Sequence, residues 1–373
     1  MQRKISSALI FIFIYLFYVI VELIKICDNL FIKYLLNEVR VIILVNIRDV
    51  ARYCGVSAMT VSRALNNSNQ ISQATKERIL KACEELGYRP NFAARSLVTK
   101  KTNMIGLIIP DITNQYYSHV SKGVSSYLSL QGYGLLLCNS DRRKDDEIRY
   151  LNFLAEGRVD GIIILPVQPR KEDYEGIANE IPFVMADNYV EGLDVSFVGN
   201  DNYHGASEII SHMIKQGFKR IGVILGSSSS SASNERFKAY KDVLKKNNIE
   251  LDNEIVLNSN ATFEDGFNLT KVLIEKGVDS IFAINDTVAL GVVKYCYLNN
   301  IRIPEDIGVA GYDNIEQSSM LPVPLTTVDQ NGNQLGKVAA ETLLNLLADE
   351  STVPKKIILK PKLVIRKSLG ENI

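Results

Sequence analysis

The chain has 373 residues, 46% of them hydrophobic and 23% charged, which is typical of a globular protein with two or three domains. Its 42 basic and 42 acidic residues cancel, so the net charge argues neither for nor against a nucleic-acid partner. The five cysteines have no CxxC or metal-ligand spacing, which excludes a cysteine-based metal site and favours reduced thiols. We therefore predict a cytoplasmic protein without a metal or cofactor.

The first 45 residues differ from the rest of the chain. Ala8–Val21 is an unbroken apolar run, shorter than the roughly 18–20 residues that a membrane-spanning helix needs. No small-residue cleavage site follows it, as a signal peptide would require. Three interpretations remain open: a start codon assigned too far upstream, a membrane tether through residues 8–26, or a buried helix. We favour the first because a compact helical unit begins directly after Val45.

Residues 46–66 predict two short helices joined by a tight turn. Gly55 permits the turn, and Ser57 is a good N-cap for the second helix. Apolar residues at helical spacing are Ile47, Val50 and Ala51 in the first helix and Val61, Ala64 and Leu65 in the second. This pattern is a helix-turn-helix, whose second helix can enter a DNA major groove. The positions of that helix that we expect to face outward are Ala58, Met59, Thr60, Ser62, Arg63 and Asn66.

A third helix completes this unit. Ser72 is its expected N-cap and Gly87 its end, with a core face made by Ile79, Ala82, Cys83 and Leu86. Between Asn46 and Lys101 there are ten basic and four acidic residues, a net charge of +6, which leaves −6 for the remainder of a neutral chain. A basic head on a mildly acidic body favours DNA binding by residues 46–90.

From Met104 onward, short apolar runs alternate with helical stretches. The runs are 105–109, 135–138, 161–165, 183–185, 221–225, 254–257, 280–284 and 307–310. Such continuous apolar strands are typical of buried parallel sheets with helices on both faces. We predict two doubly wound α/β subdomains, with a ligand site beyond the carboxyl ends of their strands.

An enzyme is not predicted. Gly132 and Gly134 lie between a helix and a following strand, the wrong order for a dinucleotide fingerprint, and no P-loop, nucleophile elbow or zinc-protease motif is present. The histidines at 119, 204 and 212 have no spacing that indicates a metal site or a catalytic triad. The alternative function is a membrane-tethered or exported sugar-binding sensor or transport receptor, and the basic head argues against it.

Residues 46–373 resemble the LacI/GalR, or lactose-repressor-like, family of bacterial transcription regulators. The motifs that carry the resemblance are IRDVA (47–51), VSAMTVSR (56–63), LGYRPN (86–91), ARSL (94–97), IGLIIPDITN (105–114), GYDN (311–314) and PLTT (324–327). Residues 1–45 lie outside the family pattern. The resemblance implies a transcriptional repressor, present as a homodimer or a tetramer, that binds a pseudo-palindromic operator under the control of a small effector.

The resemblance also implies a domain plan with a small all-α helix-turn-helix head and an α/β body of two periplasmic-binding-protein-like subdomains. The expected segments are 46–90 for the head, 91–102 for a hinge helix and linker, about 103–199 and 332–358 for the N-subdomain, and about 200–331 and 359–373 for the C-subdomain.

By similarity, bases are read by Ala58, Met59 and Arg63, while Thr60, Ser62 and Asn66 lie nearer the DNA backbone. Arg63 can make a bidentate contact with guanine. The hinge stretch contributes Arg95 and Leu97, and Leu97 matches the leucine that wedges into the central minor-groove step and bends the DNA.

The resemblance places the effector site at the ends of the body strands, where carboxylates, an arginine and aromatic rings suit a sugar-like or nucleoside-like ligand. The effector-binding residues that it implies are Tyr116, Tyr117, Asp187, Arg236, Phe263, Asn285 and Asp313. We expect Asp286 and Asn114 to cap the helices that follow them, and Ser227–Ser231 to form a flexible surface loop. The sequence identifies neither the effector nor whether it acts as inducer or corepressor.

Overall fold

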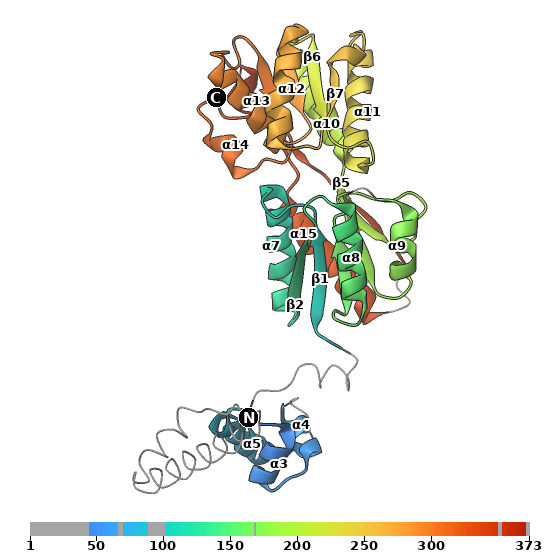
Figure 1. Ribbon diagram of the computed structural model, residues 1–373, viewed down its shortest axis with the longest axis vertical. Coiled ribbons are helices and arrows are strands. Elements are labelled where there is room, and N and C mark those ends of the chain that lie inside the picture. The colour runs from blue at the N-terminus through green and yellow to red at the C-terminus, as the bar shows by residue number, and fades with distance from the viewer. Residues whose placement is uncertain (1–44, 66–69, 89–100, 168, 350–352, 371–373) are drawn as a thin grey trace, which may run out of the picture. The chain divides into compact units, whose positions relative to one another are not determined.

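Figure 1 shows the computed structural model, which describes residues 45–65, 70–88, 101–167, 169–349 and 353–370. The chain divides into two compact units, residues 1–95 and 96–373, and each is described by itself. The extension up to residue 44, and the predicted DNA-contacting residues Asn66, Arg95 and Leu97, lie outside the described residues. Within the part that is described, no helix is long and apolar enough to cross a membrane.

The head contains the three predicted helices, α3 (Ile47–Cys54), α4 (Ala58–Leu65) and α5 (Gln73–Leu86). Asn46 and Asp49 form a reciprocal capping box at the start of α3, and Gly55 ends the helix in the left-handed conformation with φ 62°. The Ser57 hydroxyl accepts from the Thr60 amide at 3.1 Å, as expected for a cap of α4. The shared core is made by Val50, Ala51, Cys54, Val61, Ala64, Ile79, Ala82 and Cys83.

One half of the body is a six-stranded parallel sheet in the order β11-β5-β4-β3-β1-β2. Its strands are β1 (Met104–Ile109), β2 (Gly134–Asn139), β3 (Gly161–Ile164), β4 (Phe183–Ala186), β5 (Ser196–Asn200) and β11 (Lys356–Leu359). One face packs on α7 (Gln115–Leu130) and α15 (Gly332–Ala348). The other face packs on α8 (Lys144–Ala155) and α9 (Lys171–Ala178). Helices on both faces explain the almost purely apolar strands.

The other half is a four-stranded parallel sheet in the order β7-β6-β8-β9. Its strands are β6 (Ile221–Leu225), β7 (Val256–Asn258), β8 (Ser280–Ala283) and β9 (Gly308–Ala310). Around it lie α10 (Asn202–Lys215), α11 (Ser231–Lys246), α12 (Phe263–Glu275), α13 (Asp286–Leu298) and α14 (Glu316–Met320). Two 3₁₀ turns, η1 (Asn253–Ile255) and η2 (Lys367–Leu369), complete this half.

The chain passes between the two halves three times, between β5 and α10, between β10 (Thr327–Asp329) and α15, and between β11 and β12 (Lys362–Val364). Strands β10 and β12 pair with each other in antiparallel fashion beside the four-stranded sheet. The observed architecture, a helix-turn-helix head and a body of two doubly wound α/β subdomains, confirms the predicted fold class. Below, "N-subdomain" denotes the half with the six-stranded sheet and "C-subdomain" the half with the four-stranded sheet.

Candidate functional site

A pocket of about 150 Å³ lies between the N-subdomain and the C-subdomain. Its walls come from loops that directly follow strands of both parallel sheets. The residues that line it after β1, β3, β4, β6, β8 and β9 include Pro110, Pro166, Asp187, Gly226, Asn285 and Asp313. The pocket thus lies beyond the carboxyl ends of the strands, where ligands bind in doubly wound folds.

The N-subdomain wall is built around a buried tyrosine–carboxylate pair. The Tyr116 hydroxyl donates to Asp187 Oδ1 at 3.0 Å, and the Tyr117 ring packs against that of Tyr116 with centroids 5.3 Å apart. Burial raises the pKa of Asp187 above its ordinary value, while Arg236 and the Tyr116 hydroxyl oppose the rise. Asp187 has φ 67°, a left-handed conformation that is costly for a residue other than glycine.

Arg236, on α11, dominates the C-subdomain wall and is only 5% exposed. Its Nε donates to Asn202 Oδ1 at 2.8 Å, and its Nη1 donates to the carbonyl oxygen of Ile284 at 2.6 Å. The guanidinium also lies over the Tyr312 ring, 3.7 Å from the ring centroid. A cation held in this way by three separate segments is fixed in position before any ligand arrives.

Asp313 brings a second carboxyl group to the pocket. Its Oδ1 accepts from Gln330 Nε2 at 2.6 Å, and its backbone has φ 126°. Burial raises the pKa of Asp313 well above its ordinary value, Arg236 opposes that rise, and Asp286 and Asp187 add to it. Two buried carboxyl groups, both on strained backbone, therefore face the same small space, as is common where a protein clamps a ligand.

Six of the seven residues that the family resemblance suggested line this pocket, namely Tyr116, Tyr117, Asp187, Arg236, Asn285 and Asp313. Phe263 does not line it. A capping box between Thr262 and Asp265 makes Phe263 the first residue of α12, where its ring is 36% exposed. The aromatic wall expected from the C-subdomain is therefore not provided by Phe263 in this structure.

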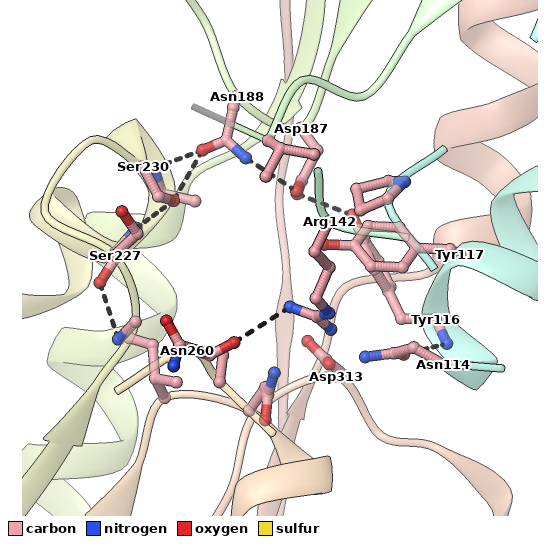
Figure 2. Close-up of a pocket in the computed structure, with 18 of the residues that line it drawn as sticks. Asn114, Tyr116, Tyr117, Arg142, Asp187, Asn188, Ser227, Ser230, Asn260 and Asp313 are labelled. Carbon is pink, nitrogen blue, oxygen red and sulfur yellow. Dashed lines mark hydrogen bonds between the residues drawn. The ribbon is translucent and has the colours of Figure 1, made fainter. Parts of the chain in front are cut away.

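Several polar residues of the pocket were missed by reasoning from the sequence (Figure 2). Arg142 donates through Nη1 to the carbonyl oxygen of Asn260 at 3.3 Å and through Nε to Asp111 Oδ2 at 3.4 Å. Asn188 Oδ1 accepts from Ser230 Oγ at 2.8 Å. Each of these two N-subdomain residues therefore contacts the C-subdomain at the pocket, Arg142 through Asn260 and Asn188 through Ser230. The sequence did contain a signal for both residues, because Arg142 and Asn188 each closely follow a predicted strand, where ligand-binding residues of this fold are expected.

The serine-rich segment forms a turn in which Ser228 and Ser229 are exposed, and it also contributes to the pocket. Ser230 caps α11, and Ser227 and Ser230 line the pocket. Among the two expected helix caps, Asn114 does cap α7, but Asp286 is the first residue of α13 and its neighbour Asn285 is the cap. The Asn285 side chain accepts from the Val288 amide at 2.8 Å, which leaves the Asp286 carboxylate for other contacts.

The head presents a second set of side chains. On α4, Met59 is 64% exposed and Arg63 is exposed, so neither fills the core. Ala58, Thr60 and Ser62 are half-buried, and the hydroxyls of Thr60 and Ser57 are 2.9 Å apart. Among the described residues, no group of His, Cys, Asp or Glu side chains could hold a metal ion.

Comparisons with known proteins agree with this two-part organisation. Residues 46–91 match the family "Bacterial regulatory proteins, lacI family", and residues 102–367 match "Periplasmic binding proteins and sugar binding domain of LacI family". The ribose operon repressor of Halalkalibacterium halodurans is 34% identical over 330 residues, which cover 87% of this chain and 98% of that protein. The transcriptional repressor PurR of Vibrio vulnificus is 35% identical over 329 residues, which cover 86% of this chain and 97% of that protein.

A solved structure shares the architecture. The lac repressor dimer bound to operator and an anti-inducer aligns with a TM-score of 0.78 and 26% identity, over 87% of this chain and 99% of that one. The matches run from the head through the body, and the relatives are named as repressors. The chain belongs to the lacI family of bacterial regulatory proteins and is a DNA-binding transcriptional regulator with an effector-binding body.

Proposed function

We propose that the chain acts as a homodimeric repressor in the cytoplasm, and that a single neutral monosaccharide bound in the pocket controls its affinity for a pseudo-palindromic operator. The observation that carries this proposal is the pocket between the subdomains, with Asp187 and Tyr116 on one wall and Arg236 and Asp313 on the other. A transport or sensor receptor is not favoured, because it would have no use for a helix-turn-helix head.

The size of the pocket favours a ligand with one ring. Its volume is about 150 Å³, and an engineered protein cavity of about 150 Å³ holds one benzene molecule. A monosaccharide or a nucleobase has one ring system and suits this volume better than a disaccharide or a nucleoside does.

The chemistry of the walls favours a sugar over a base. Each sugar hydroxyl both donates and accepts hydrogen bonds, and the lining offers acceptors at Asp187 and Asp313 and donors at Arg142 and Arg236. The lining therefore supplies both donors and acceptors, which suits a neutral ligand rich in hydroxyl groups. The name of the ribose operon repressor points the same way.

The position of the pocket gives a physical basis for control. A ligand that contacts both walls binds best at one angle between the subdomains, so binding shifts the population toward that angle. We propose that this shift is passed to the hinge stretch at 91–102 of two protomers, which pairs only on DNA. Ligand and operator then influence each other's affinity through a single conformational equilibrium.

A thermal-unfolding panel tests the ligand class. D-ribose, D-glucose, D-galactose and hypoxanthine are each added to the full-length protein, and a ligand at a hundred times its Kd should stabilise the body by about 2.7 kcal/mol. We expect at least one monosaccharide to stabilise the wild type and to lose its effect in an Asp187→Ala/Arg236→Ala variant. Stabilisation by hypoxanthine alone would mean that the effector is a base and not a sugar. The absence of a shift with all four compounds would contradict the proposal.

A further inference from the structure

Asp286 is fully buried yet does not line the pocket. Its carboxylate accepts three hydrogen bonds, at Oδ2 from Ser318 Oγ (2.7 Å) and the Ile315 amide (3.0 Å), and at Oδ1 from Thr327 Oγ1 (2.6 Å). Its own backbone amide donates to the carbonyl oxygen of Tyr312 at 2.7 Å. Asp286 therefore binds both ends of the short segment between Tyr312 and Ile315.

That segment belongs to the turn Gly311–Ile315, whose backbone is strained. Asp313 has φ 126° and Asn314 has φ 55°, conformations that cost about 1–3 kcal/mol each and persist only when the surroundings enforce them. The turn begins against Asp286, because a Cβ added to Gly311 would lie 2.1 Å from Asp286 Oδ1. Glycine at position 311 lets the backbone approach the carboxylate closely.

Other residues also support the turn, mainly through its side chains. Arg366 Nη2 donates to the side chain of Asn314 at 2.6 Å, and Gln330 Nε2 donates to the carboxyl group of Asp313. The Asp313 amide donates to the carbonyl oxygen of Val328 at 2.8 Å. The Asn314 amide donates to Thr327 Oγ1 at 3.4 Å, and that hydroxyl in turn donates to Asp286. Asp286 therefore holds the backbone of the turn directly at Ile315 and through Thr327 at Asn314.

We propose that Asp286 is a positioning residue for ligand recognition, whose carboxylate holds the turn Gly311–Ile315 in the strained form that presents Asp313 to the pocket. The effect of Asp286 on ligand binding rests on the function proposed above, whereas the effect of Asp286 on the conformation of the turn does not. Asp286 acts through Asp313 and has no contact of its own with the pocket.

The carboxylate suits this role better than an amide would. An ionised carboxylate only accepts hydrogen bonds, and here both oxygens face donors. Asp286→Asn keeps the shape but places an NH₂ group against either Thr327 Oγ1 or the Ser318 and Ile315 donors. The two hydroxyls can turn to accept from this NH₂ group, but the Ile315 amide cannot, and the bonds to a neutral amide oxygen lose the strength that the charge of a carboxylate gives them, which weakens the hold on the turn.

Hydrogen exchange without ligand tests the hold directly. In the full-length protein, peptides covering residues 311–318 are expected to exchange at least about tenfold faster in Asp286→Asn than in wild type, while peptides from β1 and β3 are unchanged. Ser318→Ala, which removes one donor, should show a smaller effect of the same kind. Ser319→Ala is the matched control, because the exposed Ser319 hydroxyl bonds to the Glu316 carbonyl oxygen and leaves Asp286 untouched. Unchanged exchange at 311–318 in Asp286→Asn would overturn the proposal.

A double-mutant cycle with D-ribose as probe tests the effect on recognition. We expect Asp286→Asn to weaken D-ribose binding about tenfold, and to have no further effect when Asp313→Asn is already present. If the fold-losses of affinity in the two single variants multiplied in the double variant, Asp286 would act independently of Asp313, which contradicts the proposal. If wild type did not bind D-ribose, that sugar would be excluded as effector, and the exchange result alone would decide whether Asp286 holds the turn.

Discussion

The guanidinium of Arg236 lies 3.7 Å from the centroid of the Tyr312 ring, while its Nη1 reaches the carbonyl oxygen of Ile284 at 2.6 Å. Tyr312 directly precedes Asp313, so this contact joins the arginine of the pocket to the turn that carries its second carboxyl group. The arrangement needs a flat cation with several donors, which lysine does not offer.

Arg236→Lys should therefore weaken ligand binding without unfolding the protein. Loss of the desolvated stacking contact costs about 2 kcal/mol, or roughly thirtyfold in Kd. Isothermal calorimetry with the sugar identified in the unfolding panel measures the change. Lys238→Ala, at an exposed position on the same helix, is the control and should bind as wild type does. Equal affinity of Arg236→Lys and wild type would show that the ligand does not depend on this guanidinium.

The two aromatic positions should behave differently from each other. Tyr116→Phe removes the hydroxyl that donates to Asp187 at 3.0 Å and should lower ligand affinity by about tenfold. Phe263→Ala should leave it unchanged, because that ring lies outside the pocket. The same calorimetric titration compares both variants, and a large loss in Phe263→Ala would place its ring against the ligand after all.

The pH dependence of stability should report on Asp313. Burial raises its pKa in the folded protein well above the value of about 3.9 for an unfolded aspartate. The folded state therefore holds this proton more tightly, and the associated stabilisation is lost as the pH rises through the pKa of folded Asp313. Asp313→Asn has no such proton to lose.

The free energy of unfolding of Asp313→Asn, relative to wild type, should consequently increase from about pH 4 up to the raised pKa of folded Asp313. Urea titrations of both proteins at several pH values give this difference, in which all other titrating groups cancel to first order. A difference that stays flat over that range would mean that the pKa of Asp313 is ordinary.

The apolar pattern of the sequence was sufficient to predict the head and eight strands of the body. It missed β5, β10, β11 and β12 for identifiable reasons. Ser196–Asn200 is short with polar ends, β10 and β12 have three residues each, and the sides of β11 alternate between exposed and half-buried. Strand β11 is at the edge of its sheet, and β10 and β12 lie outside both parallel sheets, so these three lack the continuous apolar run that marks a strand with helices on both faces.

The site was predicted less completely, because its contacts join segments far apart in the sequence. Asp187 and Asp313 follow apolar strands, and the family resemblance implied both as effector-binding residues. Gln330 and Asn188 act through partners that only the fold brings near, such as Asp313 for Gln330 and Ser230 for Asn188. Similarly, nothing in the local sequence indicated that Asn285, and not Asp286, caps α13.

The hinge proposal makes a prediction outside the described residues. Leu97→Ser should weaken operator binding and leave ligand affinity unchanged, because an apolar wedge matters only against DNA. Gel-shift titration and calorimetry on the same preparation separate the two effects. Operator affinity equal to that of wild type would remove Leu97 from the DNA interface.

The central claim is that the pocket and the head are energetically coupled, and one measurement tests it most directly. The full-length protein is titrated onto the footprinted DNA upstream of its own gene, with and without a saturating concentration of the identified sugar. We predict that the sugar changes the operator Kd about tenfold or more in wild type, and that at the same concentration it has little effect in the Asp187→Ala/Arg236→Ala variant. An operator Kd that is the same with and without bound sugar in wild type would contradict the account.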